Sequence, residues 1–409
     1  MRPFALKLAS LAIGVTIALA LSEGAAIAWL GLRDGRYTPA PELFARGTNT
    51  FVRETANKLG CRYADTLFPH PYLASVHHAN PPCGIPYLNN IGLFGTDYPA
   101  TRRSDRYTIL LTGGSVAAQM GQMLGPPAPR YLEEALNARY ISPTGKPFLV
   151  LNGGDGAWKQ PQQMILFSLF ADRVDAVVTL DGYNEQHLFR PGTTARFELP
   201  GNNFIDANPI VAQDSFGTVV ASWLAGRVSG WMEQSVLVHS HAAYLVSEAL
   251  SRATTNPENV GANTYWRMMV LPSEIYDDAG RLYAWQLAQW RKYIRIMDLT
   301  AKSYGVKSMY FLQPVPAVGK ALTEEERRST PDAAYGERYH RIVRDLEALN
   351  ESGIAVRDLL DVFAGEPGTI YADWIHAVQE AGGESRGYRL MADRMARDMA
   401  EGWGLRPKP

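Results

Sequence analysis

From about residue 106 onward, short apolar runs alternate with longer stretches in which apolar residues recur at helical spacing. Continuous apolar runs of strand length are typical of strands buried on both faces, as in parallel sheets. The alternation therefore predicts an α/β fold, a three-layer α/β/α sandwich with a central parallel sheet. The predicted strands are 107–112, 148–151, 176–180, 308–312 and 354–356, and the clearest predicted helices are 128–140, 161–171, 281–304 and 386–399.

This alternation is interrupted between about residues 190 and 275. Inside the interruption, residues 222–252 carry large apolar side chains, including Trp223 and Trp231, at roughly helical spacing, which predicts a helical insert. Such a stripe more commonly packs into a core than binds a ligand. Because the insert follows the third predicted strand, it is also a candidate lid, with a protein-docking surface as the alternative.

The first 36 residues have a different apolar pattern. Arg2 and Lys7 precede a run from 8 to 32 in which Glu23 is the only ionisable residue. This run exceeds the roughly 20 residues that cross a bilayer, so it predicts a membrane anchor, with a cleaved signal peptide as the alternative. Basic residues ahead of the span favour an N-terminus kept inside. We expect a single-pass protein of the inner (cytoplasmic) membrane, with the rest of the chain in the periplasm or exterior.

Residues 37–105 are rich in Pro, Gly, Asn and aromatic residues and show no sustained period of helix or strand. The chain thus divides into a cytoplasmic tip and anchor (1–36), an irregular exported lead-in (37–105) and an α/β domain (106–409) that carries the insert. The 40 basic and 41 acidic residues nearly balance, giving a net charge of -1 without a basic stripe. Nucleic acid is therefore not an expected partner.

Cys61 and Cys83 are the only cysteines, and an exported segment lies in an oxidising compartment. We predict a disulfide between them, which would stabilise the fold by about 3 kcal/mol for a loop of about 20 residues. Two free thiols are the alternative, and no neighbouring His or Cys has the spacing of a metal site. Mass mapping of non-reduced peptides should find the two cysteines bridged, and alkylation of both thiols would contradict the prediction.

Residues that could take part in catalysis follow three of the predicted strands. The first strand runs into Gly113, Gly114 and Ser115, a turn that would push the serine hydroxyl out at the carboxyl edge of the sheet. The next two strands are followed by Gly156 and Asn184. The backbone amides of Ser115 and Gly156 and the side-chain amide of Asn184 could donate to a developing oxyanion. Taken singly, each residue is more typical of an ordinary turn or helix cap.

Asp373 and His376 lie near the C-terminus, before the last predicted helix. A histidine can take the proton of a serine and return it to the leaving group, and a carboxylate three residues earlier can reach the other ring nitrogen. None of the seven other histidines, including His187, follows an Asp by three residues, and we expect them to be structural or at the surface.

The order Gly-x-Ser, Asn…Gly, Gly-x-Asn and Asp-x-x-His resembles the four blocks of SGNH (GDSL-like) hydrolases, over about 290 residues. The resemblance implies an SGNH/flavodoxin-like fold for 106–409, no metal and no cofactor. It makes Ser115 the nucleophile, His376 the base, Asp373 its orienting partner, and Ser115, Gly156 and Asn184 the oxyanion hole. The chain departs from the family at Gly114, where Asp is usual, and at Glu185, where Asp is usual; Gly154 is an alternative to Gly156. The Gly-Gly-Ser form resembles a membrane-anchored branch of the family.

These features favour a serine esterase or acyltransferase that acts on acylated polysaccharide or lipid of the cell envelope through an acyl-serine intermediate. The alternative from another class is a catalytically silent module of the same fold that binds a polysaccharide or scaffolds an envelope assembly. Protein partners are not indicated by the sequence.

Overall fold

The computed structural model describes residues 2–44, 66–79, 85, 87–121, 123, 128–200, 216–254, 270–330, 333–380 and 384–409. The chain forms two compact units that interleave along the sequence. One contains Met1–Arg62 and Pro209–Arg267, and the other contains Tyr63–Asn208 and Met268–Pro409. Cys61 and Cys83, and with them the predicted disulfide, lie outside the described residues.

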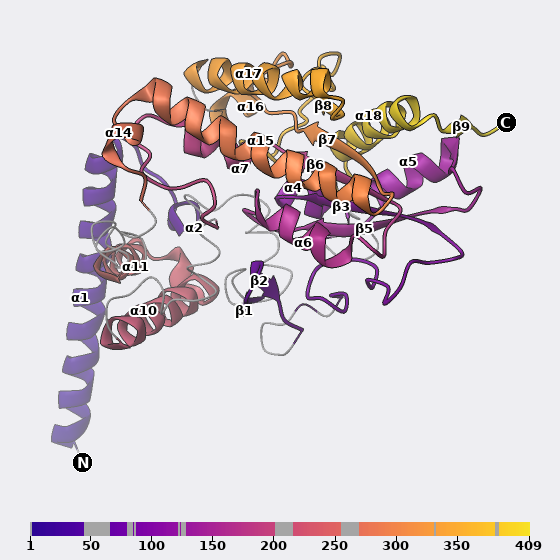
Figure 1. The fold of residues 1–409 in the computed structure, drawn as a ribbon. Helices are drawn as coiled ribbons and strands as arrows, with labels where there is room; N and C mark the ends of the chain where they lie inside the picture. The colour runs from indigo at the N-terminus through magenta and orange to yellow at the C-terminus, as the bar shows by residue number, and fades with distance from the viewer. Residues whose placement is uncertain are drawn as a thin grey trace. The chain divides into compact units, whose positions relative to one another are not determined.

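The larger unit is built on a five-stranded parallel sheet (Figure 1). Its order is β5-β3-β6-β7-β8, so the first of these strands along the chain lies inside the sheet rather than at its edge. This is the order of flavodoxin-like doubly wound sheets. The strands are β3 (Tyr107–Gly113), β5 (Phe148–Gly154), β6 (Ala176–Asp181), β7 (Lys307–Leu312) and β8 (Val356–Asp358).

The apolar strand runs form the core of this unit. All seven residues of β3 are buried, as are all six of β6, because helices flank the sheet. A strand covered on both faces has no solvent side, so its residues do not alternate between apolar and polar. The prediction of an α/β fold with a central parallel sheet is confirmed.

Helices cover the sheet on two sides. α6 (Gln162–Phe170) and α15 (Ala279–Ser303) pack against each other and against the strands, and α5 (Tyr131–Arg139) packs against α18 (Arg386–Trp403). The connection from β3 to β5 runs one way along the sheet. The connections from β5 to β6 and from β6 to β7 run the other way. Since such crossovers are right-handed, α5 lies on the opposite face from α6 and α15.

The remaining elements complete the larger unit. β1 and β2 form an antiparallel hairpin, and β4 pairs with β9. The bounds are β1 (Leu67–His70), β2 (Ala74–His77), α4 (Ser115–Met120), β4 (Tyr140–Ile141), α7 (Tyr183–Gln186), η2 (His187–Phe189), α14 (Ser273–Tyr276), α16 (Glu324–Ser329), α17 (Ala333–Glu347), η4 (Ala348–Ser352) and β9 (Arg406–Pro407).

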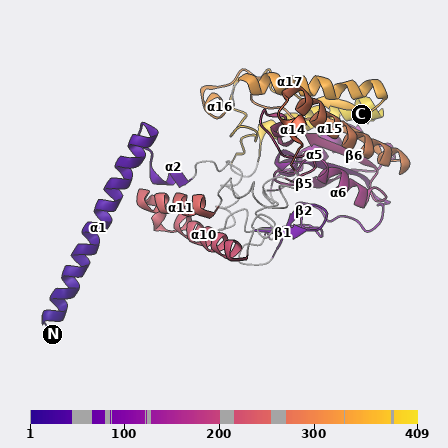
Figure 2. The ribbon, with the colours of Figure 1, turned by 60° about the vertical axis from the view of Figure 1, so that its left-hand side comes forward.

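The smaller unit is helical and contains residues 216–254 of the predicted insert, whereas the described residues 190–200 and 270–275 belong to the larger unit. α11 packs against both α1 and α10, and α2 packs against α11 (Figures 1 and 2). Among the residues that the structure describes, α1 is the one helix long and apolar enough to cross a membrane, over Ser10–Asp34. The bounds are α1 (Arg2–Asp34), α2 (Ala40–Phe44), α10 (Phe216–Gln234), η3 (Val236–His239) and α11 (His241–Thr254).

The register of the sheet brings three strand ends together. Gly113, the last residue of β3, is level with Gly154 of β5 on one side and with Leu180 of β6 on the other. The chain leaves β3 toward β5 and leaves β6 toward β7, so the connections diverge between β3 and β6. Open α/β sheets bind ligands at such a divergence, beyond the carboxyl ends of the strands.

Candidate active site

Ser115 occupies the first position of α4, directly after β3. It is 8% exposed, so it is nearly enclosed. As the first residue of a helix, its N–H has no acceptor within that helix. The turn after β3 therefore presents a hydroxyl and a backbone donor at the diverging edge of the sheet.

His376 joins Ser115 to Asp373. His376 Nε2 lies 2.7 Å from Ser115 Oγ, and His376 Nδ1 lies 2.9 Å from Asp373 Oδ2. All three residues are buried. An ionised carboxylate only accepts hydrogen bonds, so the neutral ring carries its proton on Nδ1 and accepts the serine hydroxyl at Nε2. The structure thus brings the three predicted residues into the order that serine activation requires.

Asp373 is held in its ionised form. Burial alone would raise its pKa, but hydrogen bonds from the His376 ring and from the backbone N–H groups of His376 and Ile375 lower the pKa below its ordinary value. The same oxygen, Oδ1, accepts both backbone bonds at 2.8 and 2.9 Å. The carboxylate therefore orients the imidazole and fixes the local turn together.

The turn that carries Asp373 and His376 is closed like a small hairpin. Tyr371 and Ala377 form an antiparallel bridge, and the N–H of Ala372 donates to the carbonyl of His376 at 2.8 Å. Short bonds of this kind fix the spacing of the two functional side chains. A separate contact attaches this hairpin to the rest of the unit.

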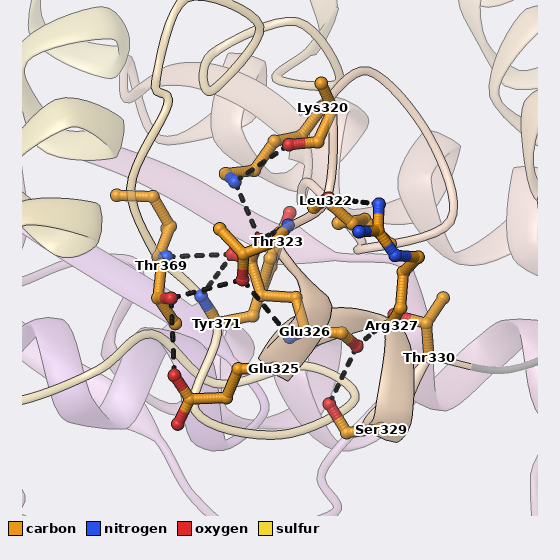
Figure 3. A network of polar contacts seen from close by, with 12 residues as sticks. Lys320, Leu322, Thr323, Glu325, Glu326, Arg327, Ser329, Thr330, Thr369 and Tyr371 are labelled. Atoms are coloured by element: carbon orange, nitrogen blue, oxygen red, sulfur yellow. Dashed lines mark hydrogen bonds and ion pairs between the residues drawn. The ribbon is translucent and has the colours of Figure 1, made fainter.

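Glu326 of α16 makes that attachment, as Figure 3 shows. Its Oε1 accepts the N–H groups of Ile370 at 2.8 Å and of Tyr371 at 3.0 Å. Its Oε2 accepts from Lys320 Nζ at 2.7 Å and from the N–H of Thr323 at 2.8 Å. The side chains of Glu326 and Lys320 are 0% exposed. One buried carboxylate thus ties the start of the hairpin to the N-terminus of α16.

The three predicted oxyanion donors differ in their surroundings. Asn184 Nδ2 donates to the carbonyl of Trp158 at 2.7 Å, and its second hydrogen is left for another acceptor. The N–H of Gly156, by contrast, donates to Asp155 Oδ1 at 2.6 Å, and that of Gly154 donates to Asn152 Oδ1 at 2.9 Å. In this structure Ser115 and Asn184 are therefore the better placed donors, and both glycine amides are engaged elsewhere.

Gly114 is explained by its contact with Asn184. A Cβ atom at position 114 would lie 2.3 Å from Asn184 Nδ2 and 3.1 Å from the carbonyl oxygen of Trp158. The residue before the serine has no room for a side chain while Asn184 keeps this position. Packing against Asn184 therefore requires glycine at position 114.

Two buried acidic residues, for which the sequence indicated no role, hold the loops at this carboxyl edge of the sheet. Glu185 is buried and accepts the N–H of Gly182 at 2.9 Å and of Gln160 at 3.2 Å, so it links the loop after β6 to the loop after β5. Burial raises its pKa, and these bonds oppose the rise. Asp155, besides holding Gly156, accepts from His77 Nε2 at 3.0 Å. The side chains of His77 and Asp155 are both 0% exposed.

His77 and His241 have carboxylate partners that the sequence did not reveal. Their carboxylate partners, Asp155 and Glu23, are close in space and far away in the chain. His187 instead packs its ring edge-on against Tyr183, and burial lowers the pKa of His187 to about 4. Local spacing could find the partner of His376 but not these contacts.

Lys159 is a further buried residue that the sequence did not single out. Its Nζ donates to the carbonyls of Phe197 and Leu199, which ties the segment after η2 to the loop after β5. Burial lowers its pKa to about 8, although Glu185 and Glu198 oppose the change.

Among the described residues, no group of three or more His, Cys, Asp or Glu is arranged to hold a metal ion. No protein-family model matches the chain, and a search of curated proteins finds no match either.

Replacing Gly114 by Ala should displace the Asn184 amide and reduce turnover of an activated ester by about 10²–10³-fold, the usual effect of losing one oxyanion donor. The matched control is Gly365→Ala, where an added Cβ would meet nothing within 4 Å. In an Asn184→Ala background the Gly114→Ala change should have little further effect. Additive losses in the double variant would show that Gly114 acts by another route.

Replacing Glu326 by Gln should lower the free energy of unfolding at neutral pH by about 3–5 kcal/mol, because Lys320 would be left buried without its counter-charge. Burial alone would raise the pKa of Glu326, but its donors lower it from 4.5 to about 2. The carboxylate therefore stabilises the fold above about pH 4.5, and this contribution is lost as the pH falls toward 2.

The measurement is denaturant unfolding from pH 7 to pH 3, where the gap between wild type and Glu326→Gln should narrow. Glu324→Gln, at a carboxylate of the same helix that is 70% exposed, is the control and should follow wild type. A gap independent of pH would contradict the role given to the Glu326 charge.

Proposed function

We propose that this protein is a serine esterase or acyltransferase of the SGNH type that forms an acyl-enzyme at Ser115. The observation that carries the proposal is the continuous chain Ser115 Oγ, His376, Asp373, with contacts of 2.7 and 2.9 Å. Two donors beside it, the N–H of Ser115 and the amide of Asn184, suit an oxyanion. The position at the divergence of β3 and β6 also fits a substrate site.

The chemistry follows from these positions. Ser115 Oγ attacks the ester carbonyl carbon while His376 Nε2 takes the hydroxyl proton, and Asp373 stabilises the resulting imidazolium. The carbonyl oxygen becomes an oxyanion that accepts from Ser115 N–H and Asn184 Nδ2. The C–O bond to the leaving group then breaks, and His376 protonates the departing alkoxide. An acyl-serine remains.

The second half repeats these steps with a new nucleophile. Water or a sugar hydroxyl gives its proton to His376 and attacks the acyl carbon, and Ser115 leaves with the proton returned. Water makes the enzyme a hydrolase, and a hydroxyl makes it a transferase. Both outcomes use the same residues, so the acceptor is the one point at which the two activities divide.

The cell envelope is the proposed location. α1 is long and apolar enough to cross a membrane, and Arg2 and Lys7 precede its apolar run. Basic residues on this side keep the N-terminus in the cytoplasm, so the remainder would lie outside the cytoplasmic membrane. Acylated polysaccharide or lipid of the envelope is the substrate class that fits this location.

The proposal is tested on the full chain with a fluorophosphonate probe, which reports an activated serine without knowledge of the substrate. Wild type should be labelled at Ser115, Ser115→Ala should not be labelled, and His376→Ala should be labelled at least about 10³-fold more slowly. Ser168→Ala and His340→Ala, at exposed helical positions, are the matched controls and should behave as wild type.

Hydrolysis of p-nitrophenyl acetate and of a longer-chain ester by the same variants then separates the activities. Turnover that needs Ser115 and His376 supports an esterase. Labelling of Ser115 with ester turnover only in the presence of a sugar acceptor supports a transferase. Absence of labelling in wild type would contradict the proposal and favour the non-catalytic alternative.

A further inference from the structure

α10 exposes most of the large apolar side chains that the structure describes in it, with Met232 the exception among them. Val220, Trp223, Leu224, Val228 and Trp231 lie within one face of the helix at 100° per residue. Trp223 is 58% and Trp231 is 61% exposed. A surface helix of a water-soluble unit normally has the opposite arrangement.

The inner face of α10 consists mainly of small residues. Ala225, Gly230 and Met232 are buried, and Gly226 lies one turn before Gly230. This helix packs against α11. Small residues spaced by four let two helices approach closely, which is how helices associate inside membranes. Large apolar residues on the exposed face and small residues on the buried face together indicate that lipid, rather than water, surrounds the exposed face.

α11 links α10 to the candidate membrane helix. Ala26 and Leu30 of α1 are buried, and α11 packs against α1. The carboxylate of Glu23 accepts from Ser240 Oγ at 2.7 Å and from the N–H of His241 at 2.8 Å, at the start of α11. The only ionisable residue of the apolar run is thus used to hold α11.

This contact places the start of α11 at the level of Glu23. A span of about 20 residues counted from Leu8 ends near Ile27. Glu23 precedes Ile27 by about one turn, which is about 6 Å along the helix axis. Helices that lie in a membrane interface are buried by about 5–10 Å. In both views α10 runs across the direction of α1 rather than along it (Figures 1 and 2).

We propose that α10 lies in the outer interface of the membrane that α1 crosses, with its exposed apolar face in contact with lipid. The two tryptophans suit this region, since their rings are enriched at membrane interfaces. Arg227 lies over the Trp223 ring at 5.9 Å and can extend toward the headgroups. α10, in the predicted insert, is thus a second membrane contact of the smaller unit beside α1. This inference rests on the proposed membrane insertion of α1.

The test uses the full chain in nanodiscs of phosphatidylethanolamine and phosphatidylglycerol. The photoreactive residue p-benzoyl-phenylalanine replaces Leu224 or Trp231 in α10, and the mass of each photoadduct is measured. Leu19 of α1 and Leu299 of α15, each 65% exposed, are the reference positions. We expect lipid adducts at 19, 224 and 231 and none at 299.

The other outcomes overturn the proposal in distinguishable ways. Lipid adducts at position 19 alone would support the membrane anchor and contradict the proposed lipid contact of α10. Adducts between two chains at 224 or 231 assign the face to a second copy. Lipid at 299 in equal yield shows that α10 is not distinguished from other apolar surface. No lipid at 19 removes the anchor as well, while fluorophosphonate labelling of Ser115 in the same samples reports the proposed activity separately.

Discussion

The parallel pairing of β3 with β5 on one side and β6 on the other brings together the loops that carry Ser115, Gly156 and Asn184. Because Gly113 is level with Gly154 and Leu180, the loops that follow the three strands leave the sheet at the same height. Ser115 and Asn184 come from two of these loops. The buried apolar runs of the strands therefore do more than form a core, since a shift in register would separate the serine from the amide beside it.

Buried carboxylates hold the loops that the sheet itself cannot hold. Beyond the strand ends the backbone N–H groups have no ladder partners, and buried donors need acceptors. Asp155, Glu185, Glu326 and Asp373 each accept one or more of these N–H groups. Asp373 also binds His376, so it is both a loop fastener and a member of the triad. Much of the acidic character of this edge is thus structural support.

Several particulars were accessible from the sequence. Four of the five strands of the parallel sheet were predicted in place because a strand buried on both faces leaves a continuous apolar run. The fifth was expected at 354–356 and spans Val356–Asp358. α17 was not predicted, although Tyr335, Tyr339, Ile342 and Leu346 recur at helical spacing and are buried. The signal was present there, but it lies among charged residues that dilute it. Asp373 and His376 were recognised because one short loop supplies both.

The sequence alone determined the class of fold, the apolar N-terminal helix and the candidate triad, because each depends on local periodicity or on a spacing of a few residues. The tertiary structure decided the contacts between distant segments. In the folded chain the backbone N–H of Gly156 donates to Asp155, and His77 contacts the same carboxylate. Contact with Asn184 requires glycine at position 114. The tertiary structure also grouped α10 and α11 with α1. These outcomes depend on which loops meet once the strands are in register, and local sequence patterns carry no record of that.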